Sequence, residues 1–303
     1  MKRLVSMILS VTIVMGVIFS VSVNSYAASP IENIYVNGEP IEFSDAERPY
    51  IQNDRTMVPL RVIAEALGAT VYWFNKGKKI QMVRYDTTLR LIIGLPSLDI
   101  YKVETNEDGE LIQNKIDTVT LDAPAFQGDE TRDFRTFVPA RAISEAFGAD
   151  VNARFIDDDE TKINRAMNVY ILDDYDESAE NVVSIADLYD NNDVPNKTLV
   201  STTGIISRID SNYYLQDENQ PYKMIALTEI PEDVEDFWTQ QLGVSDNNPI
   251  GVKVRVSGII HLDGDRYSIP IWRGMTGLQA LEYPSSSSAR DNNLSDTENL
   301  FAD

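Results

Sequence analysis

The sequence contains no cysteine and a single histidine, His261. Zinc sites, copper sites, haem and iron–sulfur clusters are held mainly by thiolate and imidazole ligands, so the usual sites of these kinds are excluded. Only oxygen-ligand metals such as calcium fit this composition. Basic residues are also scarce, because 26 Lys and Arg stand against 48 Asp and Glu, a net charge of −22 at pH 7. Such a polyanion is a poor partner for nucleic acid or anionic membranes.

The beginning of the chain has the features of an export signal. Lys2 and Arg3 precede an apolar stretch from Leu4 to Val23, and small residues follow around Ala27. This order is typical of a secretory signal cleaved after Ala27, and an uncleaved membrane anchor is the alternative. We therefore predict a signal peptide at 1–27 and a secreted or cell-wall-associated protein with no further membrane span. Without disulfides, its stability must come from burial of its apolar residues.

An internal repeat organises the first half of the chain. The segments RTMVPLRVIAEALGATV (55–71) and RTFVPARAISEAFGADV (135–151) share 11 identities in 17 positions at an offset of 80. A proline near the start of each copy favours the first turn of a helix, and a glycine near its end favours the residue after one. Apolar residues at helical spacing predict a buried face in each copy. These are Leu60, Ile63 and Leu67 in the first copy and Ala140, Ile143 and Phe147 in the second.

The segments around each predicted helix are typical of strands. Asn37-Gly38 lies between alternating apolar residues in 34–43, which is a strong hairpin signal. Strands are also predicted at 69–74 and 78–85 after the first helix. The second helix is followed by predicted strands at 149–155 and 163–172. We therefore expect an α+β domain over 28–172, built from two strand-helix-strand units.

The segment YIQNDRTMVPLRVIAEALGATVYW (50–73) closely resembles the N-terminal, or stalk, domain of copper amine oxidases. The resemblance extends over about 31–172, and the second copy departs from it with Ala153 in place of Trp73. It implies a spacer or binding module of exported bacterial surface proteins. Oxidase activity is not implied, because copper needs several histidines and the quinone cofactor forms from a tyrosine in an Asn-Tyr-Asp/Glu setting. Here Asn212-Tyr213 is followed by Tyr214.

The second half has a different pattern. Residues 173–180 carry five acids in eight positions, so we expect an acidic linker at 173–183 that resists packing. A short helix at 184–190 precedes five predicted strands, at 197–209, 212–218, 222–227, 252–262 and 266–272, with a helix at 231–243 after the third. This order, with glycines at bends, predicts a small oligonucleotide/oligosaccharide-binding (OB) barrel over 184–283. The serine-rich tail at 284–303 is expected to be disordered.

Barrels of this type often bind single-stranded nucleic acid on aromatic platforms in a positive groove. The seven basic residues of 181–283 are outnumbered by acids, which disfavours nucleic acid. Tyr214, Tyr267 and Trp272 are the candidate binding residues, and they would stack on a polysaccharide or a protein edge. The alternative is that such aromatic residues fill the barrel interior.

Other chemistry has weaker support. The acidic turns at 106–110 and 157–160 are weak calcium candidates, but neither matches the twelve-residue calcium loop. No G-x-S-x-G motif accompanies His261, and no glycine-rich phosphate loop is present. We therefore expect no catalytic residues, no bound metal and no cofactor.

Three hypotheses of function follow. The first is a non-catalytic modular protein, a scaffold or spacer carrying a binding module for an extracellular or cell-wall ligand. The second is an extracellular hydrolase that uses two carboxylates, whose pairing in space a sequence does not give. The third is a nucleic-acid-binding protein, which requires a continuous basic stripe across Lys253, Arg255, Arg266 and Arg273.

Overall fold

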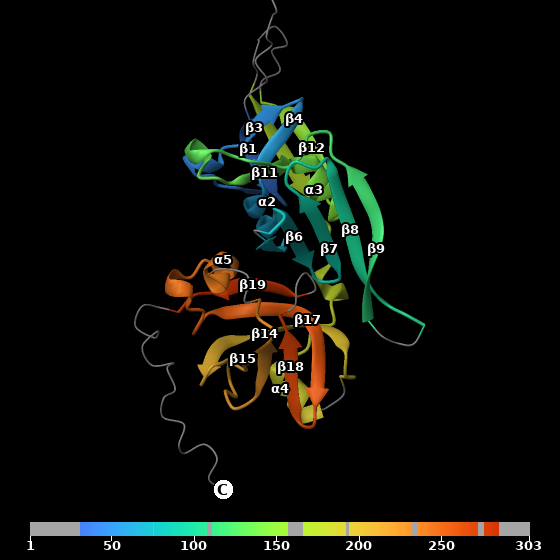
Figure 1. Ribbon diagram of the computed structural model, residues 1–303, viewed down its shortest axis with the longest axis vertical. Helices are drawn as coiled ribbons and strands as arrows, with labels where there is room; N and C mark the ends of the chain where they lie inside the picture. The colour runs from blue at the N-terminus through green and yellow to red at the C-terminus, as the bar shows by residue number, and fades with distance from the viewer. Residues whose placement is uncertain are drawn as a thin grey trace, which may run out of the picture.

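A computed structural model describes residues 31–74, 76–107, 111–156, 166–191, 194–231, 236–271 and 276–284. The predicted signal peptide, the tail from residue 285 and the acidic turn at 157–160 lie outside the described residues. Two bodies follow one another along the long axis of the molecule (Figure 1). We call residues 31–172 the repeat module and residues 184–284 the barrel module.

The repeat module is built mainly of strands. Its two α-helices have seven residues each, so the expected α+β class is confirmed only in part: the fold is mostly β with a few short helices. Its strands are β1 (Ile31–Val36), β2 (Glu39–Pro40), β3 (Tyr50–Gln52), β4 (Arg55–Pro59), β5 (Thr70–Phe74), β6 (Lys79–Arg84), β7 (Thr87–Ile92), β8 (Ser97–Thr105), β9 (Leu111–Thr120), β10 (Phe126–Gln127), β11 (Thr136–Pro139), β12 (Asp150–Phe155) and β13 (Met167–Leu172). Its helices are η1 (Asp45–Glu47), α2 (Leu60–Ala66), η2 (Glu130–Arg132) and α3 (Ala140–Ala146).

The two repeat copies are joined through their first strands. β4 and β11 pair antiparallel in the sheet β10-β11-β4-β3. The strands after the helices then enter different sheets, because β5 begins the meander β5-β6-β7-β8-β9 while β12 belongs to β12-β13-β1-β2. The sequence repeat is therefore confirmed as a structural repeat of strand, helix and strand, although the sheets around the copies differ.

The helix ends explain the repeated proline and glycine. Pro59 ends β4 with an extended backbone and serves as the N-cap of α2, one position before the predicted first turn. Gly68 then adopts a φ of +72°. The Gly68 N–H donates to Glu65 O and the Ala69 N–H to Ala64 O, which is the Schellman arrangement. The second copy repeats this geometry around Gly148, so the glycine prediction is confirmed.

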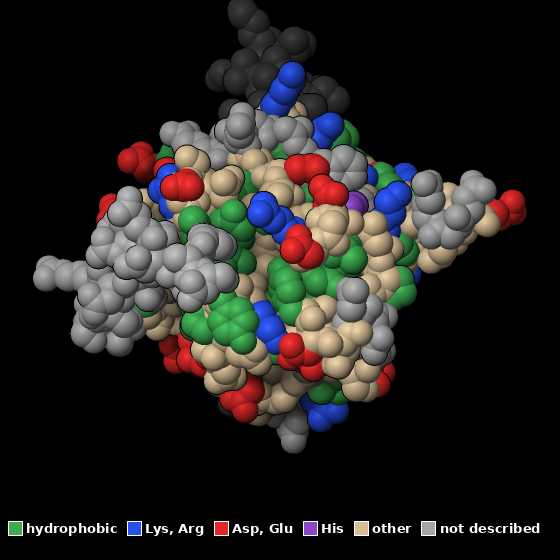
Figure 2. Space-filling view, turned by 90° about the horizontal axis from the view of Figure 1, so that it is seen from below, with side chains coloured by type: hydrophobic (Ala, Val, Ile, Leu, Met, Phe, Trp, Pro, Cys, Tyr) green, Lys and Arg blue, Asp and Glu red, His purple; other side chains and the backbone are tan. Residues whose placement is uncertain are grey.

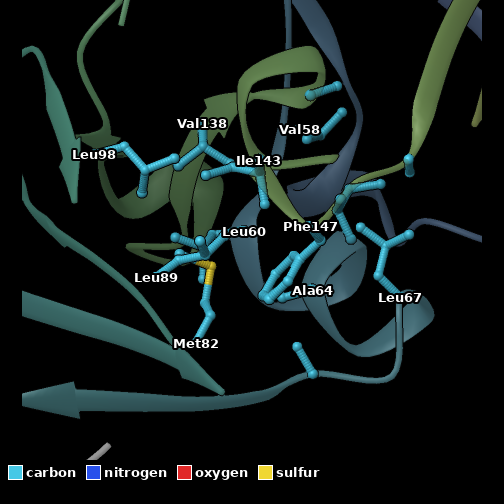
Figure 3. Packing of buried hydrophobic residues seen from close by; sticks show 14 of the residues in the cluster. Val58, Leu60, Ala64, Leu67, Met82, Leu89, Leu98, Val138, Ile143 and Phe147 are labelled. Carbon is cyan, nitrogen blue, oxygen red and sulfur yellow. The ribbon is translucent and has the colours of Figure 1, made fainter. Parts of the chain in front are cut away.

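The predicted helix faces form the core of the repeat module. All six apolar residues expected on these faces are buried in one cluster. Figure 3 shows α2 and α3 residues packed together and facing Met82, Leu89 and Leu98 of the meander. Trp73 packs against the same cluster, whereas Ala153 is exposed.

The barrel module closes on itself. β14 pairs with both β15 and β17, and the order β14-β15-β16-β18-β17 completes a five-stranded closed barrel with β16 parallel to β18. A sixth strand, β19, adds to β17 and was not predicted. The strands are β14 (Thr198–Ile209), β15 (Asn212–Gln216), β16 (Met224–Thr228), β17 (Lys253–Asp263), β18 (Arg266–Pro270) and β19 (Gly277–Glu282). The helices of this half are η3 (Glu177–Ala179), α4 (Ile185–Asn191), α5 (Phe237–Leu242) and η4 (Ser245–Asn247).

Gly204 allows β14 to lie close against β15. A Cβ there would lie 2.5 Å from Gln216 O and 2.8 Å from Leu215 Cγ, which is too close. Gly204→Ala is therefore expected to destabilise the protein by about 1–3 kcal/mol through overpacking. Gly277→Ala is the matched control, since its Cβ would meet neighbours no closer than 3.6 Å. Urea unfolding curves of both variants measure the difference, and equal midpoints would contradict this role of Gly204.

Candidate functional site

The two modules share a buried joint between β5 and β19. Tyr72 is fully buried, stacks on Phe237 at 6.4 Å between ring centroids, and donates its hydroxyl to Thr276 O. Thr70 Oγ1 donates to Leu278 O at 2.9 Å and accepts from the Leu278 N–H. Although it belongs to the repeat module, Tyr72 is part of the barrel's hydrophobic cluster. The joint therefore fixes the barrel module against the repeat module, so the two are not connected by a flexible linker alone.

Arg84 is a buried arginine that binds the ends of both repeat helices. Its guanidinium donates to Leu67 O and Phe147 O, the C-cap carbonyls of α2 and α3, and pairs with Asp173 at 2.6 Å. It also lies 4.2 Å from the centre of the Tyr175 ring. A cation at two helix C-termini is favoured by both helix dipoles. One arginine therefore holds the ends of both repeat helices.

The acidic segment after the repeat module is packed, which corrects the prediction that it resists packing. Asp173 is almost fully buried against Arg84, and Glu177 pairs with Arg255 of β17 at 2.8 Å. The Tyr175 hydroxyl donates to Glu180 at 2.9 Å. Burial, together with this carboxylate, raises the pKa of Tyr175, so the phenol stays neutral. Arg84, Arg255 and the Tyr175 hydroxyl bind three carboxylates of this segment, so its acidic residues do not keep it from packing.

A polar cavity of about 210 Å³ adjoins this segment. Asp173 and Glu180 line it, and each has one buried carboxylate oxygen without a hydrogen-bond partner among the described residues. Arg84 and Arg255 line the same cavity. Its size and polarity suit ordered water, which commonly satisfies such groups.

Both modules line a groove of about 830 Å³. The repeat module contributes Trp73 and Phe134, and the barrel module contributes Gln241 of α5 and Tyr283 after β19. Arg61 of the repeat module also lines the groove, and its guanidinium donates to Gln240 O of the barrel module at 2.7 Å and to Glu65 at 3.1 Å. Interfaces between domains are preferred positions for ligand sites, so this groove is the first candidate site.

Tyr214, the first of the predicted binding residues, lies in a shallow hollow of about 850 Å³ over β15 and β16. Tyr213 and Trp238 line the same hollow, with ring centroids 5.0 Å apart. This barrel-face hollow is the second candidate site. Sequence reasoning did not single out Trp238, because it is expected on a helix whose packing partner the pattern does not reveal.

The predicted role of Tyr267 as a surface binding residue is wrong. Its side chain is 3% exposed, its hydroxyl donates to Leu188 O at 3.0 Å, and its ring meets Tyr189 edge-on. Burial raises its pKa, as expected for a tyrosine in the barrel interior. Trp272 lies outside the described residues. In the part of the chain that the structure describes, Tyr214 and Tyr267 therefore do not form one binding site.

The basic stripe required for nucleic acid does not form from the described residues. Lys253 lies between Glu218 and Glu282, at 2.9 and 3.3 Å, and Arg255 pairs with Glu177. Arg266 pairs in register with Asp263, the last residue of β17, whereas Lys253 is the first residue of that strand. Figure 2 shows Lys and Arg side chains standing singly on the lower face of the barrel rather than in a band. Arg273 is outside the described residues.

Hydrolytic chemistry by carboxyl groups depends on their pKa values. Among the described residues, hydrogen bonds chiefly from Lys115, Thr131 and Ser178 lower the pKa values of Asp99, Asp129 and Asp176. A carboxylate-dependent hydrolase needs an acid with a raised pKa. His261 on β17 is partly exposed and pairs in register with Ser268, without a nucleophile motif.

The described ranges contain no group of three or more His, Asp or Glu that could hold a metal ion. The turn at 106–110, a weak calcium candidate, is described only up to Glu107. A search of the helices in the same ranges finds none long and apolar enough to cross a membrane.

These features define a mostly β protein of two modules, a repeat module and a closed five-stranded barrel, joined by a buried interface. Residues 35–154 match the family model described as copper amine oxidase N-terminal domain. This part of the chain is therefore a copper amine oxidase N-terminal-like domain, a module often found in cell-surface bacterial proteins. A comparison with curated proteins gives no match.

Proposed function

We propose that this chain is a secreted or cell-wall-associated, non-catalytic protein in which the repeat module acts as a scaffold and the barrel as a binding module. The family match supports the surface location, because this module is often found in cell-surface bacterial proteins. The composition, with no cysteine and one histidine, supports a role without metal or thiol chemistry. The ligand is an extracellular polysaccharide or protein.

The barrel has the strand order 1-2-3-5-4-1 with a helix between its third and fourth strands. This topology supports its assignment as an OB-type barrel, in which the face of strands two and three binds ligands. Tyr214 lies on that face, on β15. The paired state of Lys253 and Arg255 supports an uncharged or protein ligand over nucleic acid.

The observation that carries this proposal is the joint between the modules. Thr70 and Tyr72 bind the backbone of Leu278 and Thr276, and the barrel core includes Tyr72. A spacer that only separated two independent domains would not need a shared core. A rigid joint instead fixes the direction in which the barrel face is presented, which suits a scaffold for a binding module.

Binding of purified 28–303 to isolated cell-wall polysaccharide and to single-stranded DNA, at two salt concentrations and with or without calcium, tests the proposal. We expect saturable binding to the polysaccharide that is insensitive to salt, and none to DNA. Tyr214→Ala is expected to weaken it about tenfold, because one stacked aromatic contributes about 1–3 kcal/mol. Tyr222→Ala, an aromatic 68% exposed, is the control.

Two results would contradict the proposal. Salt-sensitive binding to DNA with none to wall material would favour the nucleic-acid hypothesis. Turnover of a polysaccharide or peptide, abolished by one carboxylate substitution, would show that the protein is an enzyme.

A further inference from the structure

Gln241 lies at the groove between the modules, and its amide has no hydrogen bond among the described residues. The residue is 7% exposed, and neither Oε1 nor Nε2 has a partner in the part of the chain that the structure describes. An unpaired buried amide is costly, and such groups in native proteins need an explanation. Because it lines the groove, this amide can turn toward a ligand without giving up any hydrogen bond. It offers that ligand an NH₂ group, which donates, and a carbonyl oxygen, which accepts.

Phe134 lines the same groove, and both its exposure and its backbone conformation are unfavourable. The residue is 60% exposed, and its backbone has a φ of +51°, next to Asp133 at +49°. A bulky residue in the left-handed region is strained, and such strain gathers at functional sites. The turn is held by the bond from the Phe134 N–H to Asp129 O at 3.0 Å. Tyr283, also 60% exposed, adds a second ring to the groove from the barrel module.

The charges that line the groove are paired with one another. Arg61 binds Glu65, and Arg135 binds Glu47 at 3.5 Å and Asp133 at 3.2 Å. No cation of this set is left for a phosphate, and a cationic ligand would have to compete with both arginines. The groove therefore suits a ligand that carries no charge.

We propose that this groove binds an uncharged oligosaccharide, with Gln241 as its central polar contact and Phe134 and Tyr283 as stacking surfaces. A sugar ring has an apolar C–H face that packs on an aromatic ring. Each of its hydroxyls both donates and accepts, which matches an amide with a free donor and a free acceptor. The site needs both modules, so the rigid joint also gives it its shape. The inference rests on the proposed function only for the extracellular source of the sugar.

The test uses isothermal titration of 28–303 with cellohexaose, chitohexaose, xylohexaose and mannohexaose. We expect one of these to bind with one site per chain, independently of salt. Gln241→Met is expected to weaken that binding roughly tenfold, because it removes both hydrogen bonds while nearly keeping the volume. The same variant is expected to raise Tm by roughly 2–4 °C, because it removes an unpaired buried group. A merely structural glutamine would lower Tm instead.

Phe134→Ala and Tyr283→Ala are expected to weaken binding roughly fivefold or more. Both residues are 60% exposed, so these variants should fold as the wild type does. Tyr222→Ala is the control, since Tyr222 is exposed and does not line the groove. Loss of binding in Tyr214→Ala alone would overturn the inference in favour of the barrel face. Retention of wall material without binding of any hexasaccharide would also overturn it, while the proposed function would stand. Binding of wild type to the hexasaccharide without retention of wall material would support the groove and contradict the cell-wall association in the proposed function.

Discussion

Replacement of Arg84 by methionine is expected to lower the free energy of unfolding by about 3–5 kcal/mol, because it breaks a buried ion pair on one side. The side chains of Arg84 and Asp173 are 6% and 9% exposed, so water does not replace the lost partner. The substitution also leaves Leu67 O and Phe147 O without their donor. Urea unfolding of 28–303, followed by circular dichroism, measures the change.

Arg141→Met is the matched control for this prediction. Arg141 pairs with Glu145 at 3.8 Å on the surface of α3, where its side chain is 60% exposed. Exposed pairs of this kind contribute about 0–1 kcal/mol, so this variant should unfold almost as the wild type does.

The double variant Arg84→Met with Asp173→Leu distinguishes the contribution of the buried ion pair from that of the hydrogen bonds to the two helix ends. It removes the unpaired carboxylate, so it should recover part of the loss, while the two helix carbonyls stay unsatisfied. A cost for Arg84→Met no larger than that of Arg141→Met would show that the guanidinium does not hold the two helix ends.

Local signals in the sequence predicted the local structure well. The spacing between proline and glycine located both short helices, and the apolar period located their buried faces. The five barrel strands and the helix between them follow from runs of alternating residues separated by turns. These features depend on neighbours within about ten residues, which is the range that a pattern records.

Long-range pairing explains most of what the sequence did not reveal. Asp173 belongs to an acidic run, but its partner Arg84 lies 89 positions earlier. Tyr72 lies in a strand whose alternation predicts a buried face without showing that another module covers it. β8 and β9 pair along their length, yet β9 has no fully buried residue and gave little signal.

The candidate site was predicted less well than the fold. A signal for the burial of Tyr267 was present, because it alternates with Ile269 on β18 and both point inward. The groove residues Phe134 and Gln241 come from segments with no motif, and only the folded chain brings them to one hollow. A site built from two modules therefore has no local signature that a sequence pattern can record.

Replacement of Tyr72 by alanine is expected to cost about 3–5 kcal/mol, because it empties the centre of the joint between the modules. The ring is fully buried against Phe237, so the surrounding side chains must either collapse or leave a cavity. Tyr72→Phe keeps the ring and removes only the donor to Thr276 O, which should cost about 1–3 kcal/mol. Tyr222→Ala, at an exposed position, should change stability by less than about 0.5 kcal/mol.

The larger effect of Tyr72→Ala concerns cooperativity. Modules that share a core unfold together, so calorimetry of the wild type should give one transition whose calorimetric and van't Hoff enthalpies agree. Without the Tyr72 ring, Thr70 and Arg61 still bind backbone across the same joint through side-chain hydrogen bonds. The scan should then separate into two transitions, one for each module. A single transition at a lower temperature would mean that Val83 and the remaining contacts of α5 and β19 couple the modules without Tyr72. In that case the joint would be a broad surface rather than one centred on a single tyrosine.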